Sequence, residues 1–189
     1  MVYYLLLSKR LTMKIGQKII IMGGSCSGKS TMAESLSKKF NLPVVYLDLY
    51  DPYAVPEGKE RDTRKKKINQ IIKQTVSKDA WIIEGIYEWY KFDERLNNAD
   101  TLILLLLPAY KRIWCYLKTC ITKTKRHGRW GFSAKNFRWN HIWYMLRKHD
   151  APYDLINQAI QNHPKLQVVK LKSYKEMDKF MKSVKLKNL

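Results

Sequence analysis

Cysteine is scarce in this chain, and the few cysteines present do not form a framework. The 189 residues include three of them, Cys26, Cys115 and Cys120. An odd number without regular spacing argues against a disulfide-stapled secreted scaffold and favours a reducing compartment. We therefore expect a cytoplasmic protein that depends on a hydrophobic core, for which this length is sufficient.

Long hydrophobic runs and flexible linkers are also lacking. The longest apolar run near the middle covers residues 102–107 and is closed by Pro108, so it is too short to cross a bilayer. The first residues have a small apolar patch without the features of a signal peptide. No repeat and no Gly/Ser/Pro-rich hinge divides the chain. We expect one domain over residues 1–189, with residues 1–12 as a loose extension and Met13 as an alternative start.

Acidic residues are few, and one long segment has none. The chain has 36 Lys and Arg against 16 Asp and Glu, a formal net charge of +20. Residues 109–148 contain eleven Lys or Arg, no acid, and Trp114, Trp130, Trp139 and Trp143. Such a stretch attracts polyanions: nucleoside triphosphates, nucleic acid or an acidic membrane surface. A solvated basic surface above packed tryptophans is an equally good interpretation.

One glycine-containing segment indicates a specific chemistry. Residues 23–30 read Gly-Gly-Ser-Cys-Ser-Gly-Lys-Ser, which fits the pattern G-x-x-x-x-G-K-[ST]. Its glycines allow a tight turn whose N–H groups cradle phosphate oxygens, while the lysine reaches the β- and γ-phosphates and the last serine can ligate Mg²⁺. The dipole of the following helix favours the same anion. The predicted nucleotide-binding residues are Gly23, Gly24, Ser25, Cys26, Ser27, Gly28, Lys29, Ser30 and Thr31.

The segments around this loop predict an α/β fold. The apolar residues 18–22 before it are typical of a buried strand, and Met32, Leu36 and Phe40 after it mark one face of a helix. Further strands are predicted at 44–47, 81–84, 101–107 and 167–171, and helices at 62–77, 110–125, 135–149, 152–161 and 174–184. Strands alternating with helices indicate a parallel sheet covered on both faces. Because ligands bind beyond the carboxyl ends of such strands, the loop, Asp48 and Glu84 should share one rim.

Four motifs in order give the chain a family resemblance. They are residues 23–31, 45–48 (Val-Tyr-Leu-Asp), 80–87 (Ala-Trp-Ile-Ile-Glu-Gly-Ile-Tyr) and 99–108. With these motifs, most of residues 16–172 resembles the small P-loop kinases of the adenylate-kinase-like group, most of all the bacterial FlaR-type DNA topology modulation proteins. The resemblance implies a P-loop NTPase fold, a three-layer α/β/α arrangement with five parallel strands. It also implies a small helical lid near residues 123–136 and the cofactors ATP and Mg²⁺, while the helix predicted from the residue pattern at 174–184 makes 173–189 a C-terminal helix.

The resemblance also implies roles for residues outside the loop. Arg126 and Arg129, in the lid, would stabilise the transferred phosphoryl group, with ordinary surface charge as the alternative. Asp48 would take the acceptor's proton or, with Ser30, hold the metal ion and its water. A turn-capping role for Asp48 is equally compatible with its position.

Four residues are candidates for acceptor binding: Asp51, Glu84, Tyr87 and Arg112. Glu84 follows a strand and could act at the rim or pair with the lid. Arg112 could reach a phosphate or form a surface ion pair. One departure from the family is the fourth strand, which runs to Pro108 without the carboxylate that relatives often have.

These observations favour a Mg²⁺- and ATP-dependent phosphotransferase that acts on a small molecule or nucleotide. The alternative is a nucleotide-binding regulator that contacts nucleic acid without turnover, although no nucleic-acid-binding motif is visible. A third candidate, prompted by the missing carboxylate, is a degenerate kinase that binds ATP and transfers nothing.

Overall fold

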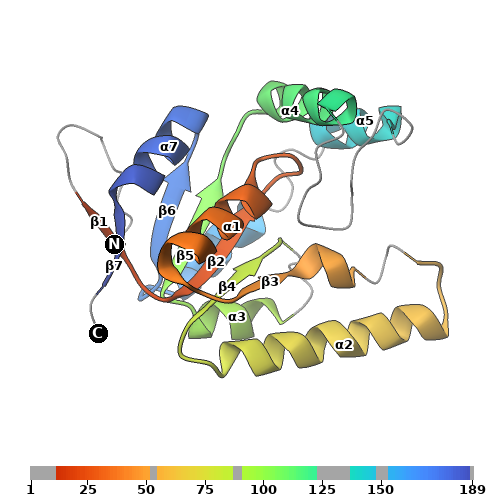
Figure 1. The fold of residues 1–189 in the computed structure, drawn as a ribbon. Coiled ribbons are helices and arrows are strands. Elements are labelled where there is room, and N and C mark those ends of the chain that lie inside the picture. Colours follow the sequence, from red (N-terminus) through yellow and green to blue (C-terminus); the bar gives the residue numbers. More distant parts are fainter. Residues whose placement is uncertain (1–11, 52–54, 87–90, 123–136, 148–152, 188–189) are drawn as a thin grey trace.

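The computed structural model describes residues 12–51, 55–86, 91–122, 137–147 and 153–187. Its main feature is a sheet flanked by helices, with two further helices beyond one end of the sheet (Figure 1). Three segments of interest lie outside the described residues: 52–54 and 87–90, which contain tyrosines, and the predicted lid at 123–136.

Five parallel strands form the central sheet in the order β3-β4-β2-β5-β6. They are β2 (Lys18–Gly23), β3 (Val44–Tyr46), β4 (Trp81–Glu84), β5 (Thr101–Leu105) and β6 (Gln167–Leu171). The inner strands are apolar because helices cover both faces of the sheet. In the register, Ile21 lies opposite Glu84 on one side and Ile103 on the other. The predicted five-stranded parallel sheet is confirmed.

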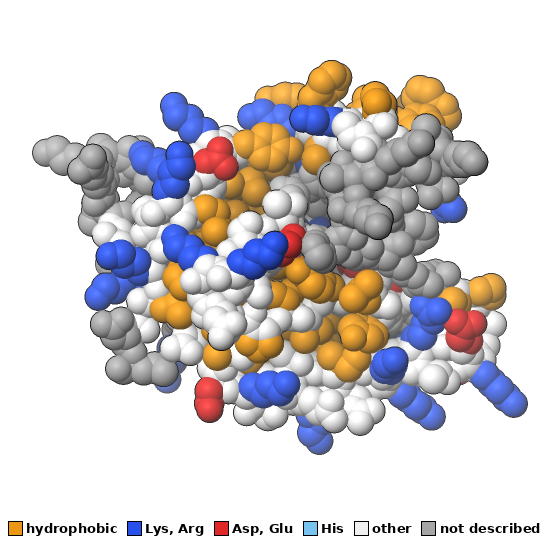
Figure 2. Space-filling view, viewed as in Figure 1, with side chains coloured by type: hydrophobic (Ala, Val, Ile, Leu, Met, Phe, Trp, Pro, Cys, Tyr) orange, Lys and Arg blue, Asp and Glu red, His pale blue; other side chains and the backbone are white. Residues whose placement is uncertain are grey.

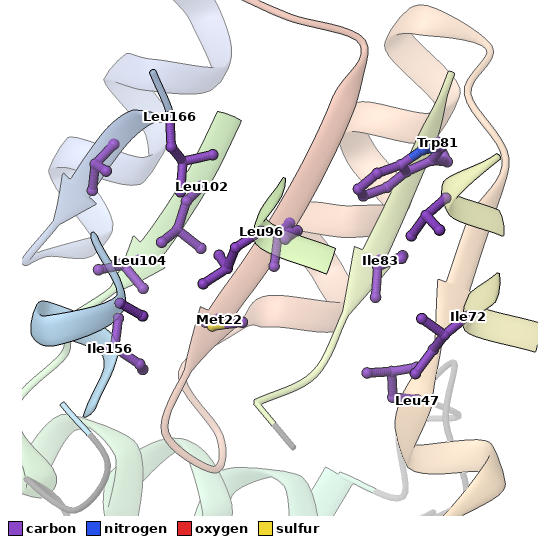
Figure 3. Packing of buried hydrophobic residues seen from close by; sticks show 14 of the residues in the cluster. Met22, Leu47, Ile72, Trp81, Ile83, Leu96, Leu102, Leu104, Ile156 and Leu166 are labelled. Carbon is purple, nitrogen blue, oxygen red and sulfur yellow. The ribbon is translucent and has the colours of Figure 1, made fainter. Parts of the chain in front are cut away.

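Helices cover the two faces of the sheet in separate layers. On one face, α1 (Lys29–Phe40) and α7 (Tyr174–Ser183) pack against alternate strand residues such as Ile19 and Ile21. On the other, α2 (Lys59–Val76), α3 (Phe92–Asn98) and α6 (Tyr153–Asn162) pack against residues such as Met22 and Leu102 (Figure 3). Successive strand residues point to opposite faces, which separates the two cores. The three-layer α/β/α arrangement is confirmed.

Two helices form a third, smaller cluster beside the loop at residues 23–30. They are α4 (Ala109–Thr122) and α5 (Trp139–Arg147), whose buried Tyr116, Cys120 and Met145 pack against Cys26. The predicted helix over 135–149 is therefore wrong at its start, because Phe137 and Arg138 precede the helix. No helix in the part of the chain that the structure describes is long and apolar enough to cross a membrane.

Several short elements differ from the predictions. The strand expected at 44–47 ends at Tyr46, and Leu47–Tyr50 forms a 3-10 helix, η1. The strand expected at 101–107 ends at Leu105, and α3 was not predicted. The C-terminal helix gives way to β7 (Val184–Leu186), which pairs in parallel with β1 (Met13–Ile15) in a separate two-stranded sheet. β1 and β7 were not predicted, because three residues with partly exposed positions give no apolar run or alternation.

Candidate functional site

The glycine-containing loop joins the central strand to the first helix, as predicted. β2 ends at Gly23 and α1 begins at Lys29, with Gly28 as its N-cap in the left-handed region at φ +92°. No side chain caps this helix, and its first turn contains no acidic residue. The N–H groups at the helix start thus keep their capacity for an external acceptor, and the helix dipole favours an anion there.

Two glycines let the loop approach its neighbours closely. A Cβ atom on Gly23 would lie 2.7 Å from the backbone oxygen of Leu105 at the end of β5. A Cβ atom on Gly24 would lie 2.4 Å from Nη1 of Arg112 on α4. The loop is therefore held between the sheet and α4, and larger residues at either position would displace it.

A buried ion pair lies directly beside the loop. Lys29 Nζ is 3.6 Å from Oε1 of Glu84, the last residue of β4, and 3.5 Å from the backbone oxygen of Gly24. The side chains of Lys29 and Glu84 are only 12% and 1% exposed. The predicted common rim therefore brings the loop and Glu84 together, and among the described residues Lys29 is the ion-pair partner of Glu84.

Asp48 adds a second carboxylate to the same electrostatic environment. Burial, aided by the charge of Asp48, raises the pKa of Glu84 from 4.5 to about 7, although Lys29 and a hydrogen bond from Ser30 act in the opposite direction. Burial alone would lower the pKa of Lys29, but the carboxylates of Glu84 and Asp48 outweigh it, so the pKa is raised. At neutral pH the lysine stays cationic while the glutamate is only partly ionised. We call Lys29, Ser30, Asp48 and Glu84 the charged cluster.

The composition of the charged cluster fits a magnesium ion. Mg²⁺ is bound by hard oxygen ligands, usually one or two carboxylates together with substrate phosphates and several waters. Oε1 of Glu84 is buried, and apart from the 3.6 Å contact with Lys29 Nζ it accepts no hydrogen bond among the described residues. Those residues contain no group of three or more His, Cys, Asp or Glu side chains that could hold a metal by themselves. The donors thus fit an ion that arrives with a phosphate ligand.

The structure contradicts one of the two roles predicted for Arg112. Its side chain is buried, so the surface ion pair is wrong. Nε donates to the backbone oxygen of Leu107 at 3.1 Å, and Nη2 donates to that of Met145 at 3.4 Å. The guanidinium group therefore links α4 and α5 behind Gly24. It fits there because Gly24 has no side chain. A contact of Arg112 with phosphate stays a prediction.

One contact with the loop was not predicted from the sequence. Ser25 Oγ lies 2.9 Å from Nε2 of His141 on α5, and the His141 ring packs against Tyr116 with centroids 4.9 Å apart. Burial lowers the pKa of His141, and the positive charges of Arg112 and Arg138 lower it further. No sequence signal marks this histidine, because 116 residues separate it from Ser25.

The remaining predicted residues are placed only in part. Asp51 closes η1, where its N–H points to the backbone oxygen of Asp48 at 3.5 Å. Thr31 is exposed in the first turn of α1. Tyr87, Arg126 and Arg129 lie outside the described residues, so their roles stay predictions.

The sheet order and the loop between its central strand and first helix define a three-layer α/β fold of the P-loop type. Among solved structures, the chain is similar to the deoxyadenosine kinase from M. mycoides with bound dATP. The TM-score is 0.52 at 17% sequence identity, over 87% of this chain and 97% of that one. No protein-family model and no curated protein sequence matches the chain. At this identity the likeness concerns the fold.

Proposed function

We propose that this protein is an ATP-dependent phosphotransferase whose acceptor is a nucleoside or a similar small hydroxyl compound. The observation that carries the proposal is the position of Lys29. It stands at the start of α1, which no side chain caps, and its ammonium group is 3.6 Å from Glu84 at the end of β4 and is influenced by the charge of Asp48 in η1. A cation, free N–H groups and carboxylates on one rim are the parts that phosphoryl transfer requires.

The loop would bind ATP, and the charged cluster would act on the phosphates, the metal ion and the acceptor. The N–H groups of residues 23–30 bind the triphosphate, and Lys29 exchanges part of its contact with Glu84 for the β- and γ-phosphates. Ser30 and Asp48 would hold Mg²⁺, which supplies neutralisation of the phosphate charge when it is bound. If it does not hold the ion, Asp48 is the base we assign to the acceptor hydroxyl, since η1 follows β3, the strand paired with β4. Arg126 and Arg129 would cover the transferred group.

The acceptor class rests on the similar enzyme and on the loops beyond β3 and β4. A nucleoside kinase has this fold, and its solved structure contains a deoxynucleotide. In this chain, Asp51 closes η1 after β3, at the rim where an acceptor would bind, and Tyr87 comes after β4 in the sequence, so its role stays a prediction. A relation to the FlaR-type proteins would leave this chemistry unchanged and broaden the set of acceptors to test.

Transfer from γ-labelled ATP tests the proposal directly. Purified protein is incubated with Mg²⁺, labelled ATP and separate panels of nucleosides, nucleotides, sugars and amino alcohols, and the products are separated by chromatography. We expect label on one panel, with deoxynucleosides foremost. ATP binding without label on any acceptor would contradict the proposal and favour a degenerate kinase, which the carboxylate-free end of β5 would then explain.

A further inference from the structure

A surface rich in tryptophan lies on α4 and α5, and the proposed kinase chemistry does not use it. Large apolar side chains gather there at the top of the molecule, with Lys and Arg beside them (Figure 2). They are between 44% and 78% exposed. Monomeric proteins rarely leave so many large apolar groups together in water. We define this Trp face by Tyr110, Trp114, Ile121, Trp139, Trp143 and Leu146.

The Trp face is the outer side of the two helices. On α4, residues 110, 114 and 121 are exposed, while Tyr116 and Cys120 turn inward and pack against Cys26 of the loop. On α5, residues 139, 143 and 146 recur at helical spacing, while Met145 is buried in the same cluster. The two helices pack against each other (Figure 1). Their outer sides therefore present apolar groups away from the phosphate loop.

Cations accompany the apolar groups. Lys111 Nζ lies 5.9 Å from the centre of the Tyr110 ring, and Arg147 Cζ lies 5.2 Å from that of Trp143. Lys118 is exposed between Trp114 and Ile121 on the same helix. The sequence from 109 to 148 contains no Asp or Glu. The partner of this surface must therefore be both anionic and able to accept apolar side chains.

We propose that the Trp face docks on the surface of a lipid bilayer that contains anionic lipids. Tryptophan and tyrosine favour the boundary between headgroups and acyl chains, aliphatic side chains enter the acyl region, and Lys and Arg meet the headgroup phosphates. The Trp face has all three kinds of side chain. Docking of this kind lays α4 and α5 flat on the membrane, in keeping with the lack of a membrane-spanning helix in the described part of the chain.

Two other occupants fit the same observations less well. A second copy that used this face would bring Lys111, Lys118 and Arg147 against the same cations, without any acid between residues 109 and 148 to neutralise them. A nucleic acid would use the cations and stack on the aromatic rings, but it would not bury the aliphatic side chain of Ile121, which is 78% exposed. An anionic bilayer accommodates the aromatic, aliphatic and cationic side chains of the Trp face together.

Partitioning of the full chain onto vesicles tests the proposal. We expect co-sedimentation with vesicles of phosphatidylcholine and phosphatidylglycerol, at least about tenfold stronger than with phosphatidylcholine alone and weakened by salt. Brominated acyl chains should quench the tryptophan fluorescence, since the indole rings would lie at the acyl boundary. Equal sedimentation with both vesicle types, or an absence of quenching, would overturn the proposal.

A pair of variants separates the Trp face from general surface charge. The double variant Trp114→Gln/Trp143→Gln should lose about tenfold or more in partitioning while its circular dichroism stays unchanged. Tyr174→Gln, at an exposed aromatic residue of α7, is the matched control and should partition like wild type. Wild-type partitioning by the double variant would overturn the proposal. So would tryptophan-dependent oligonucleotide binding or dimerisation in place of vesicle binding.

Discussion

At the scale of single residues, the central feature is the ionisation of Glu84. Its carboxyl group is buried beside Lys29 and Asp48, and its pKa is raised from 4.5 to about 7. Between these two values the folded protein binds more protons than the unfolded chain, so the free energy of unfolding falls as the pH rises. The stability that Glu84 contributes is therefore complete below about pH 4.5 and lost as the pH passes about 7.

Replacing Glu84 with glutamine should remove this pH dependence. In Glu84→Gln the side chain is neutral at every pH, so the variant should gain stability relative to wild type as the pH rises from 5 to 8. By linkage, the gain in the free energy of unfolding is at most about 3 kcal/mol. The gain is reduced because the glutamine no longer pairs with the buried Lys29. Urea unfolding across this range measures the difference. Parallel curves for the two proteins would show that Glu84 does not titrate in this window.

The candidate site was predictable where its residues follow one another or follow strands. The loop at 23–30 is contiguous, and Glu84 and Asp48 are found by the rule that ligands bind at strand ends. The burial of Arg112 and the contact of Ser25 with His141 were not predictable, because they depend on how α4 and α5 pack against the loop. Packing between residues so far apart in sequence leaves no local pattern.

At the scale of elements, Arg112 joins three parts of the structure. It donates to Leu107 before α4 and to Met145 on α5, and it lies against Gly24 of the loop. A movement of α5 would therefore shift Arg112 against the phosphate loop. The contact between His141 of α5 and Ser25 of the loop couples the same two elements.

Arg112→Gln should destabilise the protein by about 2 kcal/mol or more, because buried carbonyl groups would lose their donors. Urea unfolding at neutral pH measures this loss, with Lys118→Gln as the matched control at an exposed position of the same helix. The control should unfold like wild type. Equal stability of both variants would mean that the arginine does not support the packing of α4 and α5.

The elements themselves were predictable in proportion to their length. The five strands of the central sheet are apolar runs, the helices α1, α2, α4, α6 and α7 have clear apolar periodicity, and their predictions were close. The seven residues of α3 bury only Arg95 and Leu96, which gives no periodic signal. Arg95 donates to the backbone oxygens of Gly85 and Ile86, so the role of α3 is to hold the segment after β4.

At the scale of the whole molecule, the two ends of the described chain meet. β1 pairs with β7, and Val184 packs in the same core as Ile15, Phe180 and the sheet residues that face α1. This contact joins the segment before the central strand to the segment after α7, so it should matter for global stability although it lies far from the rim.

Val184→Asp should therefore lower the free energy of unfolding by about 2–4 kcal/mol, since it places a carboxylate at a position that is 1% exposed. Lys185→Asp, at the exposed neighbouring position of β7, is the control for the change of charge and should cost far less. Thermal unfolding distinguishes the two. A similar loss in both variants would indicate an effect of charge and not of packing.

The measurement that tests the central claim most directly is kcat/KM for phosphoryl transfer from ATP in wild type, Lys29→Ala and Lys38→Ala. Lys38 lies on the same helix, where it is exposed and paired with Glu34. We predict a loss of about 100-fold or more for Lys29→Ala and wild-type activity for Lys38→Ala, because Lys29 stands at the phosphate loop and Lys38 does not. Equal activity of wild type and Lys29→Ala would contradict the assignment of this loop as the catalytic phosphate site.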